Sequence, residues 1–319
     1  MLILIVLISF LLITLIYLQS KYLFLIDTPY GQNHKSLFNK NTPLSGGIYL
    51  FVTIAVYTNY IEYSKITILV SIFIFLLLIV GIFSDLKRNF SPKLRLLLQF
   101  IIVFTFILLV DLEIKRTGVF FLDYFIKNNL FNLLFTSFCI IIVINGSNFC
   151  DGVNCNVIGY YIVVTFGILL TELSTPTGFP NIEILITIFI VFFISNLFQK
   201  SFLGDNGTYV VSAVMSIYVI NFINLNNSAS PLLALNLLWY PAFENLFTII
   251  RRLTANKKVQ IADRFHLHIL ILEKITNKNH LIISNSLTGI ILNIIMFIGI
   301  YMSVNFYNDK KILLLILLI

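Results

Sequence analysis

Charged residues are scarce in this chain: Asp, Glu, Lys and Arg together make up 11% of its 319 residues. A soluble domain carries about 25% charged residues, so burial in a water-soluble core cannot account for this composition. Hydrophobic residues make up 59%, and the mean hydropathy is +0.97. Lipid must therefore be the solvent for most of the chain.

Cysteine is also scarce, with only Cys139, Cys150 and Cys155. The count is odd and two of the three fall in a predicted cytoplasmic loop, which argues against a disulfide framework. Cys150 and Cys155 lack the paired spacing and the histidine partners of a zinc site. We interpret them as reduced residues without a chemical role.

Charge is absent from residues 1–20, which are long enough to cross a hydrocarbon core of ~30 Å. A signal peptide would need a basic start, a shorter apolar core and a small-residue cleavage site, and none is present. We expect a retained first span. The apolar tail 312–319 is too short to span at ~1.5 Å per residue, so it lies in the interface or the natural protein continues.

Charge-poor apolar runs recur along the whole chain and predict an all-α, polytopic membrane protein with about ten transmembrane helices. No repeat or soluble domain interrupts them, so residues 1–319 are expected to form a single membrane-embedded domain. The runs lie near residues 1–20, 45–61, 66–84, 94–110, 128–147, 157–174, 184–199, 207–224, 231–249 and 281–304.

Basic residues are distributed unevenly between the loops that join these runs. Fifteen of the twenty-one lysines and arginines fall in alternate loops, together with all four histidines. Because basic loops stay on the cytoplasmic side, this set is predicted to be cytoplasmic and the N-terminus to be outside. The net charge of +7 is then mostly a topology signal and does not indicate a nucleic-acid partner. The loops are 21–44, 85–95, 148–156, 200–206 and 250–280.

The same loops hold five aspartates, each where an apolar run meets a polar segment: Asp27, Asp85, Asp151, Asp205 and Asp263. An Asp at the centre of a transmembrane helix costs about 2.5–3.5 kcal/mol, so even acids at helix ends need a reason. Gathered on one face beside Lys, Arg and His, they predict a site for a divalent metal and phosphates.

Two of these loops have simpler interpretations as well. Asn148 and Asp151 are three residues apart and share a face at a helix end, but a helix C-cap rich in Asn and Gly would look the same. The glycines flanking Asp205 allow close approach to a ligand, or only a tight turn.

The longest loop carries His266 and His268, which are two residues apart and do not match the i, i+4 pairing of a helical zinc site. They suit donors to phosphate better than metal ligands. Glu244 lies seven residues before Arg251, roughly on its helical face, and we interpret it as structural.

The motifs together are more specific than any one of them, and they resemble the polyprenyl-phosphate N-acetylhexosamine-1-phosphate transferases, glycosyltransferase family 4. The resemblance covers about residues 20–285, with the motifs in the family's order on its cytoplasmic side. The motifs are Asp27…Pro43-Leu-Ser-Gly46-Gly47, Ser84-Asp85…Lys93, Asn148-Phe-Cys-Asp151-Gly152, Phe202-Leu-Gly204-Asp205-Asn-Gly207 and Asp263-Arg264-Phe-His266-Leu-His268.

The resemblance implies an enzyme of the bacterial inner membrane with a cytoplasm-facing cleft and a lipid-facing groove. It would transfer a sugar 1-phosphate from a UDP-N-acetylhexosamine to polyprenyl (undecaprenyl) phosphate, release UMP and so begin a lipid-linked surface glycan such as an O-antigen or cell-wall polymer. The implied cofactor is Mg²⁺, with Mn²⁺ as an alternative. The oligomeric state stays open, a homodimer being one option.

Roles carry over to the residues that match the family's motifs. Asp205 matches the metal-binding Asp, and Asp85 matches the second of an adjacent acidic pair near the lipid phosphate and the metal. Asp151 and Asn148 match residues of the nucleotide-sugar site. The remaining matches are expected to bind substrate: Phe202 on uracil, and Lys93, Arg252, His266 and His268 at the phosphates.

The chain also departs from the family pattern. Ser84-Asp85 stands where typical members have Asp-Asp, and Asn154 stands at the second acid of Asp-Gly-x-Asp-Gly. Ile269 replaces a third histidine, and the Arg expected after Asp27-x-Pro29 is missing.

Three alternatives to this function remain open. The peptidoglycan phospho-MurNAc-pentapeptide transferase usually has the paired aspartates and a fuller His cluster. A secondary transporter would place acids near the bilayer midplane, often at broken helices. An inactive relative is suggested by Ser84 and Asn154.

Overall fold

The protein is helical along almost its whole length. The computed structural model describes residues 2–22, 24–27, 42–61, 63–86, 90–176, 180–254, 265–276 and 281–318. Of the described residues, 79% are helical, which confirms the predicted all-α fold class. The elements are α1 (Leu2–Tyr22), β1 (Ile26–Asp27), β2 (Thr42–Pro43), α2 (Gly46–Ile61), α3 (Lys65–Leu86), α4 (Pro92–Val110), α5 (Phe120–Phe125), α6 (Asn129–Cys150), α7 (Asn156–Leu169), α8 (Ile182–Leu197), α9 (Gly204–Leu225), α10 (Leu232–Thr254), α11 (Leu267–Ile275), α12 (Leu281–Asn305) and α13 (Lys310–Leu318).

Each of the ten predicted apolar runs overlaps one of these helices, although the run 157–174 extends five residues beyond the end of α7. Within the described residues, six are long and apolar enough to cross a membrane, namely α3, α4, α6, α9, α10 and α12. Helices α7 and α8 are apolar but have 14 and 16 residues, and a rise of ~1.5 Å per residue gives them only about 21–24 Å. The protein is thus a multi-helix membrane protein, but the number of ten spans is not confirmed.

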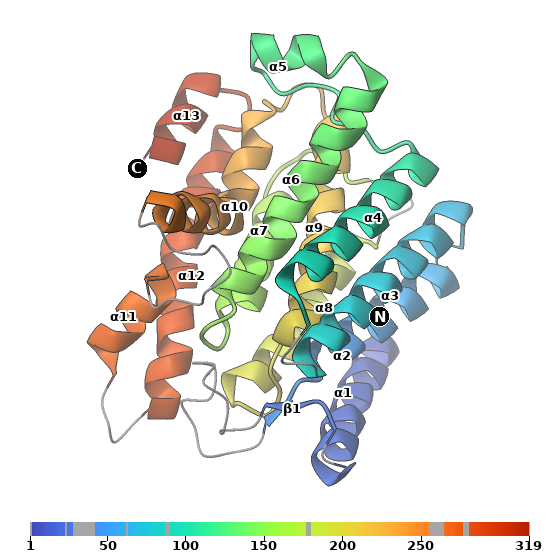
Figure 1. Cartoon of the computed structure of the whole chain (residues 1–319), viewed down its shortest axis with the longest axis vertical. Helices are drawn as coiled ribbons and strands as arrows, with labels where there is room; N and C mark the ends of the chain where they lie inside the picture. Colours follow the sequence, from blue (N-terminus) through green and yellow to red (C-terminus); the bar gives the residue numbers. More distant parts are fainter. Residues whose placement is uncertain are drawn as a thin grey trace.

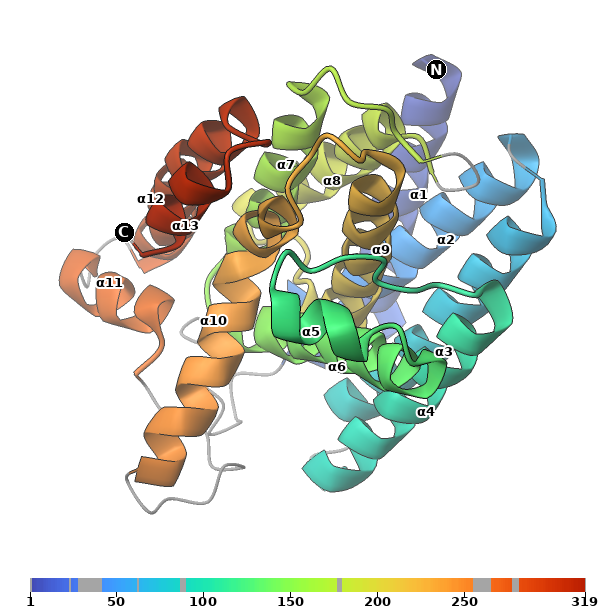
Figure 2. The ribbon, with the colours of Figure 1, turned by 90° about the horizontal axis from the view of Figure 1, so that it is seen from above.

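Helix α9 forms the centre of the bundle, and the other long helices surround it (Figures 1 and 2). Of its most apolar 18-residue window, 78% is buried, against 22–50% for the other five candidate spans. Small and hydroxyl residues along it, such as Gly207, Thr208, Ser212 and Ala213, let neighbouring helices approach closely. A central helix that is shielded from lipid on all sides can carry polar groups at low cost.

Two glycines bring α2 and α3 against the first turn of α9. A Cβ on Gly81 would lie 2.3 Å from Cα of Asn206, and one on Gly47 would lie 2.5 Å from its carbonyl carbon. The backbone N–H of Gly47 also donates to Oδ1 of Asn206, at 2.7 Å. The absence of side chains at these two positions therefore sets where α9 begins relative to α2 and α3.

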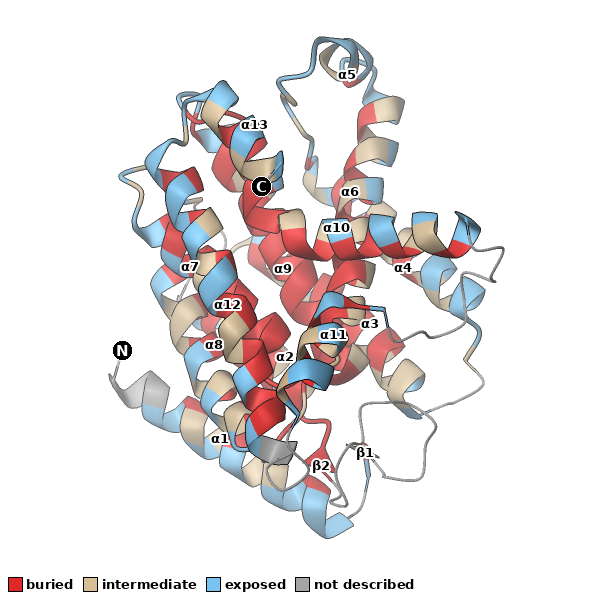
Figure 3. Ribbon diagram, turned by 90° about the vertical axis from the view of Figure 1, so that its left-hand side faces the viewer, coloured by how far each residue is buried: buried red, intermediate tan, exposed pale blue. Residues whose placement is uncertain are grey.

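Helix α10 changes direction along its length, and its later part lies across the bundle (Figure 3). It contains Pro241, which lacks an N–H and so cannot bond the carbonyl of Leu237 four residues earlier. The Tyr160 hydroxyl on α7 donates to that carbonyl, at 2.7 Å. Gly146 on α6 makes room for the bend, since a Cβ there would be 1.8 Å from the Pro241 oxygen.

Helices α3 and α6 end at the end of the bundle where α9 begins, the lower end in Figure 1. Strands β1 and β2 pair antiparallel, with Ile26 opposite Pro43. The Phe202 N–H donates to the Pro43 oxygen at 2.8 Å, and the Gly46 N–H donates to the Phe202 oxygen at 3.2 Å. These bonds fix the segment that leads into α9.

Candidate active site

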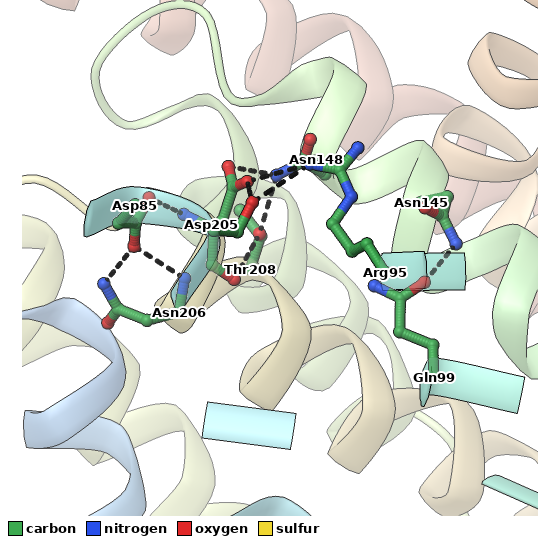
Figure 4. A network of polar contacts seen from close by, with 9 residues as sticks. Asp85, Arg95, Gln99, Asn145, Asn148, Asp205, Asn206 and Thr208 are labelled. Atoms are coloured by element: carbon green, nitrogen blue, oxygen red, sulfur yellow. Dashed lines mark hydrogen bonds and ion pairs between the residues drawn. The ribbon is translucent and has the colours of Figure 1, made fainter. Parts of the chain in front are cut away.

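Asp205, in the first turn of α9, is at the centre of a polar cluster formed by four helices (Figure 4). Its Oδ2 accepts from the Ser84 hydroxyl at 2.6 Å and from Nη1 of Arg95 at 3.2 Å. Its Oδ1 accepts from the Asn148 amide. Arg95 also donates to the Ser84 oxygen, at 3.1 Å. Residues of α3, α4 and α6 thus meet at one carboxylate that retains 14% side-chain exposure.

Asp85 binds the same helix start from the other side. Its Oδ1 accepts from the backbone N–H of Asp205 at 3.0 Å, and its Oδ2 accepts from the backbone and side-chain N–H groups of Asn206 at 3.1 and 2.6 Å. The first N–H groups of a helix have no partner within it and carry positive charge, so an acid there is stabilising. Asp85 therefore caps α9 although it belongs to α3.

Gly204 makes this approach possible. Its φ is +68°, in the left-handed region that favours glycine. A Cβ at this position would be 2.9 Å from Oδ2 of Asp85. A side chain here would push the Asp85 carboxylate away from the start of α9.

A cavity lies beside the first turn of α9. Asp151, Asn154, Asn196, Phe202, Gly204 and Asn285 are among the residues that line it. Its wall combines one carboxylate, three amides and one aromatic ring. Such a mixture suits a polar ligand that has a flat aromatic part.

Asparagine side chains hold the turn that follows Asp151. The N–H of Asn154 donates to Asn285 Oδ1 at 2.6 Å, and the N–H of Cys155 donates to Asn196 Oδ1 at 2.6 Å. The Cys155 carbonyl accepts from the Asn293 amide, at 2.7 Å. Asn154 itself is buried and donates to the Ser286 hydroxyl at 3.3 Å. The substitution of Asn for an acid at 154 thus fits a network of neutral amides and hydroxyls.

The histidines approach the same region from α11. His266 stacks on Phe149, with ring centroids 5.7 Å apart, and on His268, at 5.6 Å. His268 fills the space beside Gly152, where a Cβ would be 2.0 Å from its Nε2. The Arg252 guanidinium lies 5.5 Å from the Phe149 ring. The histidines therefore pack against the segment that carries Asn148 and Asp151.

The structure brings most of the predicted site residues to one end of the bundle. Asp85, Asp205 and Asn148 share one hydrogen-bonded cluster, and Asp151 lines the cavity together with Phe202. Lys93 is exposed on the first turn of α4, and the hydrogen bonds of the Asp205 cluster do not include it. The side chain of Asp27 and the residues Asp263 and Arg264 lie outside the described residues.

Three residues of the site were not assigned a role from the sequence. Arg95 and Ser84 bind Asp205, and Glu244 binds His266. Arg95 had one usable signal: it lies in the basic loop after Asp85, two residues beyond Lys93. Glu244 is interpreted as structural from the sequence, since its spacing places it on the helical face of Arg251 and points to no other partner.

The donor groups fit a magnesium ion that is held mainly by substrate. Among the described residues, no three His, Cys, Asp or Glu side chains gather in a way that could hold a metal alone. Two carboxylates, Asp85 and Asp205, meet at the start of α9. Mg²⁺ commonly takes one or two carboxylates and completes its shell with water and phosphate oxygens, so this pair fits such an ion.

The cysteines take no part in this chemistry. None forms a disulfide, and Cys150 and Cys155 are buried. Burial raises the pKa of the Cys155 thiol to about 12, so it stays protonated at neutral pH. A buried and protonated thiol is a poor nucleophile and a poor metal ligand.

Comparison with known proteins gives one family. No curated protein matches the chain. Residues 67–223, about half of the chain, match the family described as Glycosyl transferase family 4. The matched region begins in α3 and ends in α9, so it contains Ser84, Asp85, Asn148, Asp151 and Asp205. The match supports glycosyl transferase family 4 as the family of this membrane protein and a transferase as its class.

Proposed function

We propose that this protein transfers an N-acetylhexosamine 1-phosphate from a UDP-sugar to polyprenyl phosphate and releases UMP. The observation that carries the proposal is the cluster at Asp205, where a carboxylate, a guanidinium and a helix start meet beside a polar cavity. This combination is suited to two phosphate groups that must be brought together and partly neutralised.

The balance of charges around Asp205 favours a phosphate-bound cation. The start of α9 and Arg95 supply positive charge, while Asp85 and Asp205 supply two negative charges. A diphosphate would be repelled by the carboxylates unless a cation accompanied it. Asp205 and Asp85 would hold Mg²⁺, which when bound would neutralise the developing charge on the phosphate oxygens.

Arg95 is suited to the phosphates as well. It holds Asp205 with one nitrogen, and a guanidinium has five N–H groups in a fork that matches phosphate oxygens. In the absence of substrate it pairs with Asp205, at 3.2 Å. We infer that it then contacts a phosphate oxygen of a bound substrate while it keeps Asp205 oriented.

The cavity is suited to the nucleotide end of the donor. Phe202 offers a ring on which uracil can stack, and the amides of Asn154, Asn196 and Asn285, each of which also bonds within the protein, make the wall beside it polar. Asp151 lines this cavity, and its neighbour Gly152 contacts His268. We infer that the diphosphate runs from the cavity toward Asp205, with His268 as a donor to its oxygens and His266 beside it.

The chemical step needs no residue that acts as a base on the acceptor. The second pKa of a phosphomonoester is near 6, so polyprenyl phosphate is already largely a dianion at neutral pH. One of its oxygens attacks the phosphorus that carries the sugar, a new P–O bond forms, and the bond to the bridging oxygen breaks. That oxygen leaves with UMP. Positioning and charge neutralisation supply the rate, so Ser84 in place of an acid is compatible with activity.

The acceptor would reach the site from the bilayer. The transverse part of α10 exposes a stripe of apolar side chains, which includes Phe243, Phe247 and Ile250. Such a face is stable only against lipid or an isoprenoid chain. We propose that the polyprenyl tail lies along it, with the site on the cytoplasmic side of a bacterial inner membrane and the N-terminus outside.

Membranes that contain the protein should convert labelled UDP-N-acetylhexosamine and polyprenyl phosphate into a lipid-linked sugar diphosphate only when Mg²⁺ or Mn²⁺ is present. A panel of UDP-sugars that includes UDP-MurNAc-pentapeptide distinguishes the two transferase alternatives. Asp205→Asn should abolish turnover and leave membrane insertion intact, with Glu172→Gln, an exposed acid, as the control. If no UDP-sugar in the panel gave a lipid-linked product, or if Asp205→Asn kept wild-type turnover, the proposal would fail.

A further inference from the structure

Glu244 on α10 is a buried acid with two specific partners. Its side chain is 5% exposed, and its Oε2 lies 3.0 Å from Nδ1 of His266. Its Oε1 accepts from the backbone N–H of Leu267, at 3.1 Å. Burial of a carboxylate is costly unless it is paired and hydrogen-bonded, and here each oxygen has a partner. Both partners lie at the start of α11.

This pair determines which nitrogen of His266 carries a proton. An ionised carboxylate can only accept hydrogen bonds, so Nδ1 of His266 must donate to Glu244. In a neutral imidazole the other nitrogen, Nε2, is then the acceptor. The carboxylate thereby selects one of the two tautomers of the ring.

Three neighbours fix the orientation of the ring. Phe149 and His268 both stack on His266, at 5.7 and 5.6 Å between centroids. Glu244 holds one edge. Phe149 follows Asn148 directly, and Asn148 binds Asp205. The ring of His266 is therefore held in one plane, and Phe149 is the residue that connects it to the Asp205 cluster.

We propose that Glu244 is a positioning residue that fixes the tautomer and the plane of His266, so that Nε2 can accept a hydrogen bond from a hydroxyl or N–H group of the bound nucleotide sugar. This inference deepens the proposed function and rests on it. A merely structural Glu244 would only tie α10 to the start of α11, through Leu267. The positioning role requires a proton on Nδ1 of His266, whereas the structural role does not, and the presence of this proton can be measured.

Glu244→Gln separates the two roles because it keeps the size of the side chain and reverses one hydrogen bond. The Leu267 N–H can only donate, so the glutamine oxygen stays with Leu267 and the amide nitrogen faces His266. That nitrogen donates, so Nδ1 must lose its proton and the opposite tautomer becomes favoured. Glu244→Asp keeps the charge, and Glu273→Gln removes an exposed acid of α11 as a matched control.

The first experiment reads the tautomer directly. The chain has only four histidines, so ¹⁵N-histidine labelling with assignment by a His266→Asn variant gives a readable NMR spectrum of the detergent-solubilised protein. We expect a proton on Nδ1 of His266 in the wild type and in Glu273→Gln, and its loss in Glu244→Gln. A wild-type ring protonated only on Nε2, or an unchanged ring in Glu244→Gln, would overturn the proposal without reference to any substrate.

The second experiment measures turnover. Loss of a residue that orients a functional histidine typically costs about 10- to 100-fold in activity, so we expect kcat of Glu244→Gln to fall by about that factor, with partial recovery in Glu244→Asp. In a His266→Ala background, Glu244→Gln should add less than about twofold, because both changes act through one ring. If the losses in kcat from Glu244→Gln and His266→Ala multiplied in the double variant, the two residues would act independently and the proposal would be wrong. A wild-type protein that shows the expected tautomer but no transferase activity would refute the proposed function and leave the Glu244–His266 pairing intact.

Discussion

The cap that Asp85 places on α9 predicts a loss of stability that can be worked out from its contacts. Asp85→Ala removes the acceptor of three N–H bonds, and two of the donors belong to the fully buried Asn206. Loss of an N-cap costs about 0.5–2 kcal/mol, and a buried donor left without a partner costs about 1–3 kcal/mol. Because Asp85 itself is only half-buried, we expect these costs together to lower the free energy of unfolding by about 3 kcal/mol.

This loss should be visible as a shift in melting temperature. At about 2 °C per kcal/mol for a chain of this size, the apparent Tm of Asp85→Ala in detergent should fall by about 6 °C. Asp85→Asn keeps one oxygen of the same reach, so about half that shift is expected. Size-exclusion chromatography after a heating series gives the fraction that remains folded.

The control is Glu172→Ala, which removes an exposed acid of the loop after α7. A melting temperature of Asp85→Ala within about 1 °C of this control would show that Asp85 does not cap α9. The first turn of α9 would then be held by its other contacts, and the orientation of Asp205 would need a different explanation.

Arg95→Gln removes the charge partner of Asp205 but keeps a hydrogen-bond donor of similar length. Because a charge-assisted contact to a phosphate is lost, turnover in the labelled-lipid assay should fall by about 100-fold or more. Turnover within about threefold of wild type would contradict the role of Arg95. Tyr160→Phe leaves the Leu237 carbonyl at the bend of α10 without its donor and should lower the apparent Tm by about 2–6 °C, whereas Tyr301→Phe, on an exposed side chain, should not. Burial raises the pKa of Cys155 to about 12, so maleimide at pH 8 should leave this thiol unlabelled in the folded protein and label it after denaturation. Peptide mass spectrometry measures the labelling. Rapid labelling of the folded protein would show that the thiol is accessible and ionised.

The departures from the family motifs acquire a physical meaning in the structure. Ser84 donates to Asp205, so an acid in its place would put two carboxylates next to each other and would need a further cation. Asn154 joins a network of amides in which a buried charge would be costly. Both substitutions remove a negative charge from the same end of the bundle.

Much of the architecture follows from the sequence because lipid imposes simple rules. A run of about 20 apolar residues must form a helix, and acids and bases must gather at its ends. For this reason each predicted run overlaps a helix, and Asp85, Asn148 and Asp205, which the sequence placed on one side of the membrane, meet in one hydrogen-bonded cluster. The number of spans was harder to predict, since hydropathy alone does not show how far short helices such as α7 and α8 reach.

The sequence by itself predicted a helical membrane protein that resembles glycosyl transferase family 4, with its polar motifs on one side of the membrane. Only the tertiary structure decided which of those polar groups meet: Asp85 with the start of α9, Arg95 and Ser84 with Asp205, and Glu244 with His266. The reason is that hydropathy depends on local composition, whereas a hydrogen bond between residues on different helices depends on where glycines and a proline let the helices cross. Gly47, Gly81 and Gly146 set those crossings, and their effect is visible only when the helices are packed.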